Sequence, residues 1–138
     1  MTIPLWCLLG FATWTLLILV VAVAPFRVGS VAAGKARPSS FPADTPHGPD
    51  WYRRVMRAHA NCVENLPVFA TVVIVGHLAG LRDAGFDRMA QVYVWARVCQ
   101  TIAHVASGRG VVINVRFTFF LTQLICVAGM IYRIVRVG

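Results

Sequence analysis

Polar and charged side chains lead directly into an apolar stretch near the middle of this chain. The run from Arg57 to Pro67 contains one arginine, two asparagines and one glutamate, and the residues that follow, 68–78, are mostly apolar. A carboxylate or an amide placed in hydrocarbon costs several kcal/mol unless it has a partner. Within a membrane helix such groups therefore indicate a functional site.

The spacing of these groups fits one face of a helix. Arg57, Asn61 and Glu64 fall at i, i+4 and i+7, which places all three side chains on the same side. His59 is two residues from Arg57 and points elsewhere, so we expect it to be solvated at the membrane interface.

Two later apolar segments carry polar faces of the same kind. Arg97, Gln100 and His104 fall at i, i+3 and i+7 on one segment, and Arg116 and Gln123 are seven residues apart on the next. Three helices are thus expected to turn polar faces toward a shared interior.

Distances along the helices predict an ion pair within this interior. Glu64 would lie about 20 Å from the start of its helix, and Arg97 about 13 Å from the same end of the bundle. We therefore expect a buried Arg97–Glu64 ion pair, because each charge would otherwise be stranded. The alternative is that these polar groups serve only to pack the helices together.

The excess of arginine over glutamate predicts an anionic ligand. A small peptide-like anion would fit, with arginine on its carboxylates, Glu64 on its ammonium group, and Asn61 or Gln100 on its amides. Glutathione has this chemistry, and positive charge beside its sulfur would favour the reactive thiolate. His104 could donate a hydrogen bond or act as an acid or base.

Composition places these helices in a membrane. The 138 residues are 58% hydrophobic, and the mean hydropathy is +0.69. We expect an all-α membrane protein, a single domain over residues 1–138 that forms an antiparallel bundle of four transmembrane helices. The expected spans are 4–26, 51–81, 88–106 and 111–135. The four cysteines fall one in each expected helix without metal-site spacing, so no metal is expected.

The first apolar segment could instead be a signal peptide, since Ala22-Val23-Ala24 resembles a cleavage site. We favour a membrane span, because no lysine or arginine precedes the segment and it is longer than a signal-peptide core.

Lysine and arginine are unequally divided between the two ends of the expected bundle. Eight lie at or near the connectors 27–50 and 107–110, and four lie at the opposite end. The positive-inside rule therefore predicts a multi-pass protein with these two connectors in the cytoplasm and both termini on the other side. The basic residues are then expected to lie at the cytoplasmic surface of the membrane and not to bind nucleic acid. We expect the long connector 27–50, which is rich in glycine, serine and proline, to be flexible.

The motif Arg-Ala-His-x-Asn-x-x-Glu-Asn-x-Pro-x-Phe, from Arg57 to Phe69, resembles the signature of the MAPEG family, the membrane-associated proteins in eicosanoid and glutathione metabolism. The resemblance extends from about Trp51 to Gln123 and includes an arginine on each of the last two helices.

This resemblance implies a homotrimer in the lipid bilayer that binds glutathione between neighbouring protomers near the cytosolic side. Arg57, Asn61, Glu64 and Arg97 match the glutathione-contacting positions, and Arg116 matches the arginine associated with thiolate activation. The implied function is a glutathione-dependent transferase or peroxidase-like enzyme that acts on small lipophilic electrophiles or hydroperoxides.

Three positions depart from the family pattern. His104 and Phe120 stand where members with established chemistry have tyrosine, and Ala60 replaces a residue that is basic in some members. Two alternatives therefore stay open: a non-catalytic membrane protein acting in assembly or partner binding, and an enzyme that uses another low-molecular-weight thiol.

Overall fold

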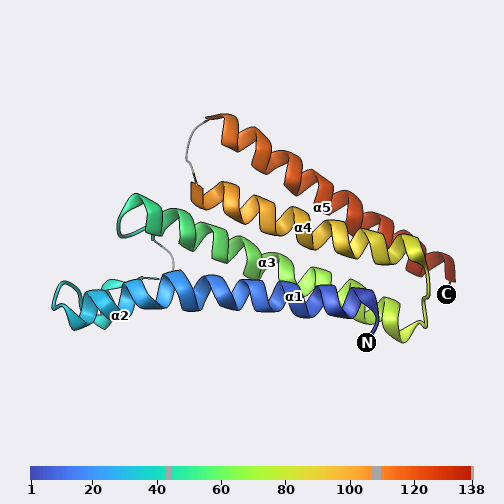
Figure 1. The fold of residues 1–138 in the computed structure, drawn as a ribbon, viewed down its shortest axis with the longest axis horizontal. Helices are drawn as coiled ribbons and strands as arrows, with labels where there is room; N and C mark the ends of the chain where they lie inside the picture. Colours follow the sequence, from blue (N-terminus) through green and yellow to red (C-terminus); the bar gives the residue numbers. More distant parts are fainter. Residues whose placement is uncertain (43–44, 107–109, 138) are drawn as a thin grey trace.

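The computed structural model describes residues 1–42, 45–106 and 110–137, and long helices dominate this part of the chain. Of α1, α3, α4 and α5, each runs antiparallel to the next one along the chain, and the N- and C-termini lie at the same end (Figure 1). The helical elements are α1 (Ile3–Ile18), a π-helical turn (Leu19–Val23), α2 (Ala24–Ala32), a 3-10 turn (Pro38–Ser40), α3 (Asp50–Leu78), α4 (Ala84–Ala106) and α5 (Gly110–Val137).

The first helical stretch continues past its expected end at residue 26. α1, the π-helical turn and α2 follow one another without a break to Ala32. Pro25 has no backbone N–H to donate, which disrupts the regular hydrogen bonding of the turn before it. The backbone N–H of Ala24 bonds to the carbonyl oxygen of Leu19, five residues earlier. The widened turn therefore carries the helix through the proline without ending it.

The part of the connector between α2 and α3 that the structure describes is anchored, although we expected a flexible segment. The rings of Phe26 and Tyr52 lie 4.1 Å apart, and Phe41 packs edge-on against Phe26 at 6.4 Å. His47 lies 5.5 Å from the ring of Tyr52. Arg27 Nε donates a hydrogen bond of 2.8 Å to the Tyr52 hydroxyl. Through these contacts the start of α2 and the residues Phe41 and His47 of the connector pack around Tyr52 at the start of α3.

Three aromatic rings form the centre of the core. Phe69 on α3 and Tyr93 on α4 are stacked, with centroids 4.2 Å apart, and Phe11 on α1 lies 6.0 and 5.9 Å from them. All three side chains are buried. Packed aromatic pairs contribute about 0.5–1.5 kcal/mol beyond the area they bury. This packing fixes α3 and α4 against α1.

The end of the bundle that holds the termini has tight packing and a neutralised charge pair. Arg133 on α5 forms an ion pair with Asp83, the residue before α4. A hydrogen bond from the Gly85 backbone N–H and the Arg133 guanidinium hold the pKa of the Asp83 carboxyl below its ordinary value. Gly76 on α3 packs against the ring of Phe86, where a Cβ would clash.

Among the described residues, three helical stretches are long and apolar enough to cross a bilayer. They are Ile3–Ala32, Asp50–Leu78 and Asn114–Val137. α4 is less apolar because it carries Arg97, Gln100 and His104, and all three of these side chains are buried. These three polar side chains of α4 therefore face the protein interior.

Candidate functional site

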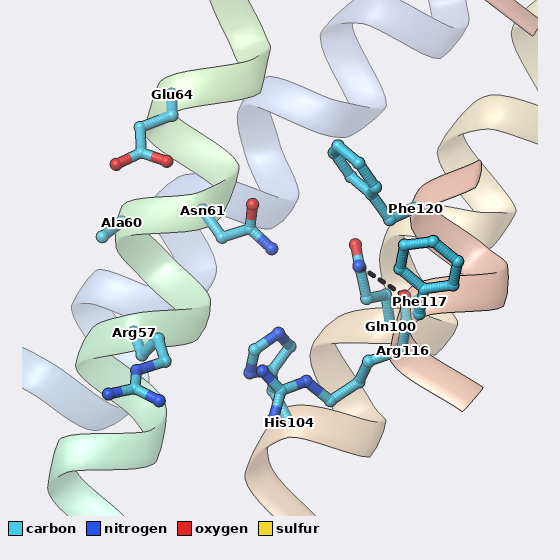
Figure 2. Close-up of a pocket in the computed structure, with 9 residues that line it drawn as sticks. All are labelled: Arg57, Ala60, Asn61, Glu64, Gln100, His104, Arg116, Phe117 and Phe120. Carbon is cyan, nitrogen blue, oxygen red and sulfur yellow. Dashed lines mark hydrogen bonds between the residues drawn. The ribbon is translucent and has the colours of Figure 1, made fainter. Parts of the chain in front are cut away.

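A cleft of about 420 Å³ lies between α3, α4 and α5, and it is lined by charged, amide and aromatic side chains. Figure 2 shows these side chains projecting from three helices. The lining residues are Arg57, Ala60, Asn61, Glu64, Gln100, His104, Arg116, Phe117 and Phe120.

α3 supplies the motif residues because its opposite side is buried in the core. Ala58 and Cys62 pack into the core, which leaves Arg57, Asn61 and Glu64 outside the core. Figure 2 shows the Asn61 amide directed into the space between α3 and α5, whereas the Glu64 carboxylate lies toward the outer side of α3. The helical spacing that grouped these three residues therefore corresponds to a shared lining of the cleft.

α4 and α5 supply the other side of the cleft. Gln100 and His104 are buried, and Gln100 Nε2 donates a hydrogen bond of 2.9 Å to the backbone oxygen of Arg116. In Figure 2 the Arg116 side chain extends from α5 toward His104, whereas the Arg57 side chain lies along α3 on the other side of the cleft. Six of the seven residues expected at the ligand site thus line one cleft.

Arg97 is the exception, and the expected Arg97–Glu64 ion pair is wrong. Among the described residues, the only ion pairs are Asp50–Arg53 and Asp83–Arg133. Arg97 is 1% exposed and lies 5.8 Å above the Phe11 ring, on the side of α4 that faces α1. Glu64 is exposed on α3. Distance along a helix gives only the depth of a residue, whereas the rotation of α4 about its axis places Arg97 on the side that faces α1, away from Glu64.

Arg97 contacts the cleft indirectly. Its Nη1 donates a hydrogen bond of 3.0 Å to Gln100 Oε1, whereas Nε and Nη2 are buried without a hydrogen-bond partner in the described part of the structure. Gln123 on α5 donates to the same Gln100 oxygen at 3.1 Å. A buried polar network therefore lies directly behind the cleft.

The electrostatics of the cleft favour an anion. Arg57 and Arg116 have no carboxylate within ion-pair distance among the described residues. Arg116 Nε is buried and has no hydrogen-bond partner there. Unpaired guanidinium groups bind carboxylates, phosphates and thiolates strongly because charge-assisted hydrogen bonds are shorter and stronger than neutral ones.

Phe117 is a lining residue that the sequence reasoning did not single out. It follows Arg116 directly and is 63% exposed, and Phe120 lies beside it on the same helix. Polar spacing gave no signal for it, because an aromatic residue in an apolar helix is indistinguishable from a lipid-facing one. The two phenylalanines give the α5 side of the cleft an apolar surface.

Comparison with known proteins assigns the chain to a family. No curated protein matches it closely enough to be reported as a relative. The model of the MAPEG family matches residues 3–136, which covers nearly the whole chain, including every residue that lines the cleft. The chain therefore belongs to the MAPEG family, whose members are membrane proteins of eicosanoid and glutathione metabolism.

Proposed function

We propose that this protein is a membrane-bound, glutathione-dependent transferase or peroxidase-like enzyme whose active site is the cleft between α3, α4 and α5. The observation that carries the proposal is the pair of arginines, Arg57 on α3 and Arg116 on α5, that line the cleft from two helices without a carboxylate partner in the described structure. Family membership supports glutathione as the anion that they bind.

Each part of glutathione has suitable partners in this cleft. Arg57 would pair with a carboxylate of the tripeptide, and Asn61 would bond to its amide groups. Glu64 would pair with the ammonium group. His104 offers a ring nitrogen for a further hydrogen bond.

Arg116 would stabilise the ionised sulfur. The S–H bond of glutathione breaks, its proton leaves to a base or to water, and the guanidinium donates to the resulting thiolate. Attack on a carbon electrophile forms the S–C bond and expels the leaving group with its electron pair. With a hydroperoxide, two glutathiones are oxidised to the disulfide while the hydroperoxide is reduced to an alcohol and water.

The apolar side of the cleft supports a lipophilic second substrate. Phe117 and Phe120 lie beside Arg116 and are exposed on the surface of α5. Such a surface favours contact with acyl chains, so a hydrophobic electrophile could reach the thiolate from the bilayer.

We further propose that α4 spans the bilayer with the three more apolar stretches. Its outward positions Val92, Trp95 and Ile102 are exposed and apolar, whereas Arg97, Gln100 and His104 are buried. Both termini would lie on the non-cytoplasmic side and the basic connectors in the cytoplasm. Glu64 is exposed within the α3 span, and a carboxylate facing lipid is costly. Coverage of this face by a neighbouring copy in a homotrimer would remove that cost.

Purified protein in detergent or nanodiscs tests the function directly. We expect glutathione to raise its melting temperature and to be conjugated to a model electrophile. Arg57→Ala should weaken glutathione binding at least tenfold, because it removes a charge-assisted contact. The matched control is Arg88→Ala, an exposed arginine of α4 that does not line the cleft.

Two results would overturn the proposal. If glutathione neither stabilises nor reacts, and another low-molecular-weight thiol does both, the enzyme uses that thiol. If no thiol binds or reacts, the protein is non-catalytic and acts in assembly or partner binding.

A further inference from the structure

The side chain of Gln100 joins α4 to α5 directly behind the cleft. Its Oε1 accepts hydrogen bonds from Arg97 Nη1 at 3.0 Å and from Gln123 Nε2 at 3.1 Å. Its Nε2 donates to the backbone oxygen of Arg116 at 2.9 Å. Three of the hydrogen-bonding positions of this amide are therefore occupied by the protein itself.

This occupancy argues against a direct role for Gln100 in binding the ligand. A glutamine amide has two acceptor sites and two N–H donors, so both acceptor sites and one donor are used here. The residue is also only 4% exposed. A bound tripeptide would have to compete with contacts that already satisfy a buried amide.

Arg97 determines which way the Gln100 amide points. A guanidinium can only donate hydrogen bonds, so it must face the amide oxygen and not the nitrogen. The nitrogen is consequently directed at the Arg116 carbonyl group. A charged donor on the oxygen also polarises the amide and strengthens the hydrogen bond made by its N–H.

We propose that Gln100 is a positioning residue, held in orientation by Arg97, that fixes the backbone of Arg116 so that its guanidinium meets the thiol. This inference rests on the proposed function and is an alternative to the expectation that Gln100 and Arg97 are glutathione ligands. The buried charge of Arg97 acts on the cleft through an amide, without touching the substrate.

Three variants separate positioning from binding. Gln100→Leu removes every hydrogen bond of the amide. Gln100→Glu keeps an acceptor for Arg97 and Gln123 but cannot donate to the Arg116 carbonyl. Gln123→Leu is the matched control, because it removes one partner of Gln100 and leaves the contact with Arg116 in place.

Three measurements give the functional readout: the absorbance of the thiolate as a function of pH, the turnover number, and the affinity for glutathione by calorimetry. We expect both Gln100 variants to reduce the fraction of bound thiol that is ionised at neutral pH, and kcat with it, by about tenfold or more, because small displacements of a catalytic group have effects of this size. Glutathione affinity should change less than threefold, and Gln123→Leu should resemble the wild type in all three measurements.

A tenfold loss of affinity with unchanged thiol ionisation would make Gln100 a ligand and overturn the proposal. Wild-type values in Gln100→Leu would overturn it as well. If only Gln100→Glu lost activity, the new negative charge would be the cause, and the positioning role would be rejected.

Amide hydrogen exchange without any thiol separates this inference from the proposed function. Exchange over residues 114–120 should be faster in Gln100→Leu than in Gln123→Leu or the wild type, because α5 loses its contact at Arg116. Unchanged exchange there would reject the positioning contact even if the enzyme is active. Faster exchange in a protein that binds no thiol would reject only the proposed function.

Discussion

Two regions of this molecule use arginine in different ways. Where the termini lie, Arg133 is paired with Asp83. At the cleft, Arg57 and Arg116 have no carboxylate partner in the described structure, and Glu64 lies toward the outer side of its helix. The contact near the termini uses an arginine to join two elements, whereas the cleft leaves two arginines available. Unpaired charge in a membrane protein is expensive, which supports the proposal that an anion binds in the cleft.

The largest expected effect concerns Arg116, one of the two unpaired arginines of the cleft. Arg116→Ala should lower turnover by about 100-fold or more, because removal of one donor to a developing negative charge typically costs this much. Steady-state kinetics with a lipophilic electrophile would measure the loss. Arg116→Lys keeps the charge but not the guanidinium geometry and should be intermediate. Equal activity in all three proteins would exclude Arg116 from the chemistry.

The packing at the terminal end should be sensitive to added volume. Gly76→Val should destabilise the protein by about 1–3 kcal/mol, because its side chain would meet the Phe86 ring. Gly10→Ala is the matched control, since a Cβ there meets no neighbour within 4 Å. Unfolding in mixed detergent would measure both changes. Equal stability of the two variants would show that α3 and α4 are not closely packed at Gly76.

Buried Arg97 and paired Arg133 should differ in their contribution to stability. Arg97→Met should leave the free energy of unfolding unchanged or raise it by about 1 kcal/mol, because a buried charge without a counter-ion is costly to retain. Arg133→Met should lower the same quantity, since it leaves Asp83 unpaired. A large loss of stability in Arg97→Met would indicate a structural anion or partner for this guanidinium.

The smallest expected effect is the pH dependence of the terminal end. The pKa of Asp83 lies below its ordinary value of 3.8 in the folded protein, so its ionised form stabilises the fold. That contribution is present above about pH 4 and is lost as the pH falls through the lowered pKa of the folded state. Melting temperatures from pH 6 to pH 2 should therefore fall less steeply in Asp83→Asn. Parallel curves would show that this carboxylate is not linked to folding.

Helical periodicity was sufficient to identify most of the cleft. Arg57, Asn61 and Glu64 were grouped by spacing alone, and they line one cavity with Gln100 and His104. Periodicity assigns side chains to a face of their own helix, which is a local property. The placement of these three residues on one face of α3 therefore does not depend on the tertiary structure.

The rotation of one helix against another could not be obtained in this way. Arg97 and Gln100 are three residues apart on one face, yet Arg97 points at Phe11 and only Gln100 reaches the cleft. The difference depends on how α4 packs against α1 through the aromatic core. The anchoring of the connector is similar, because the contact of Phe41 with Phe26 brings together residues whose pairing no spacing rule encodes.

The π-helical turn at Leu19–Val23 affects the direction of the side chains that follow it in α2. A residue advances an α-helix by about 100°, so a wider turn redirects the side chains that follow it. Phe26 and Arg27, which follow this turn, both contact Tyr52. The same sequence with one residue deleted between 19 and 23 would present a different face to α3. The π-helical turn thus changes the direction in which the side chains of α2 point. The contacts that attach the basic connector to the bundle depend on that direction.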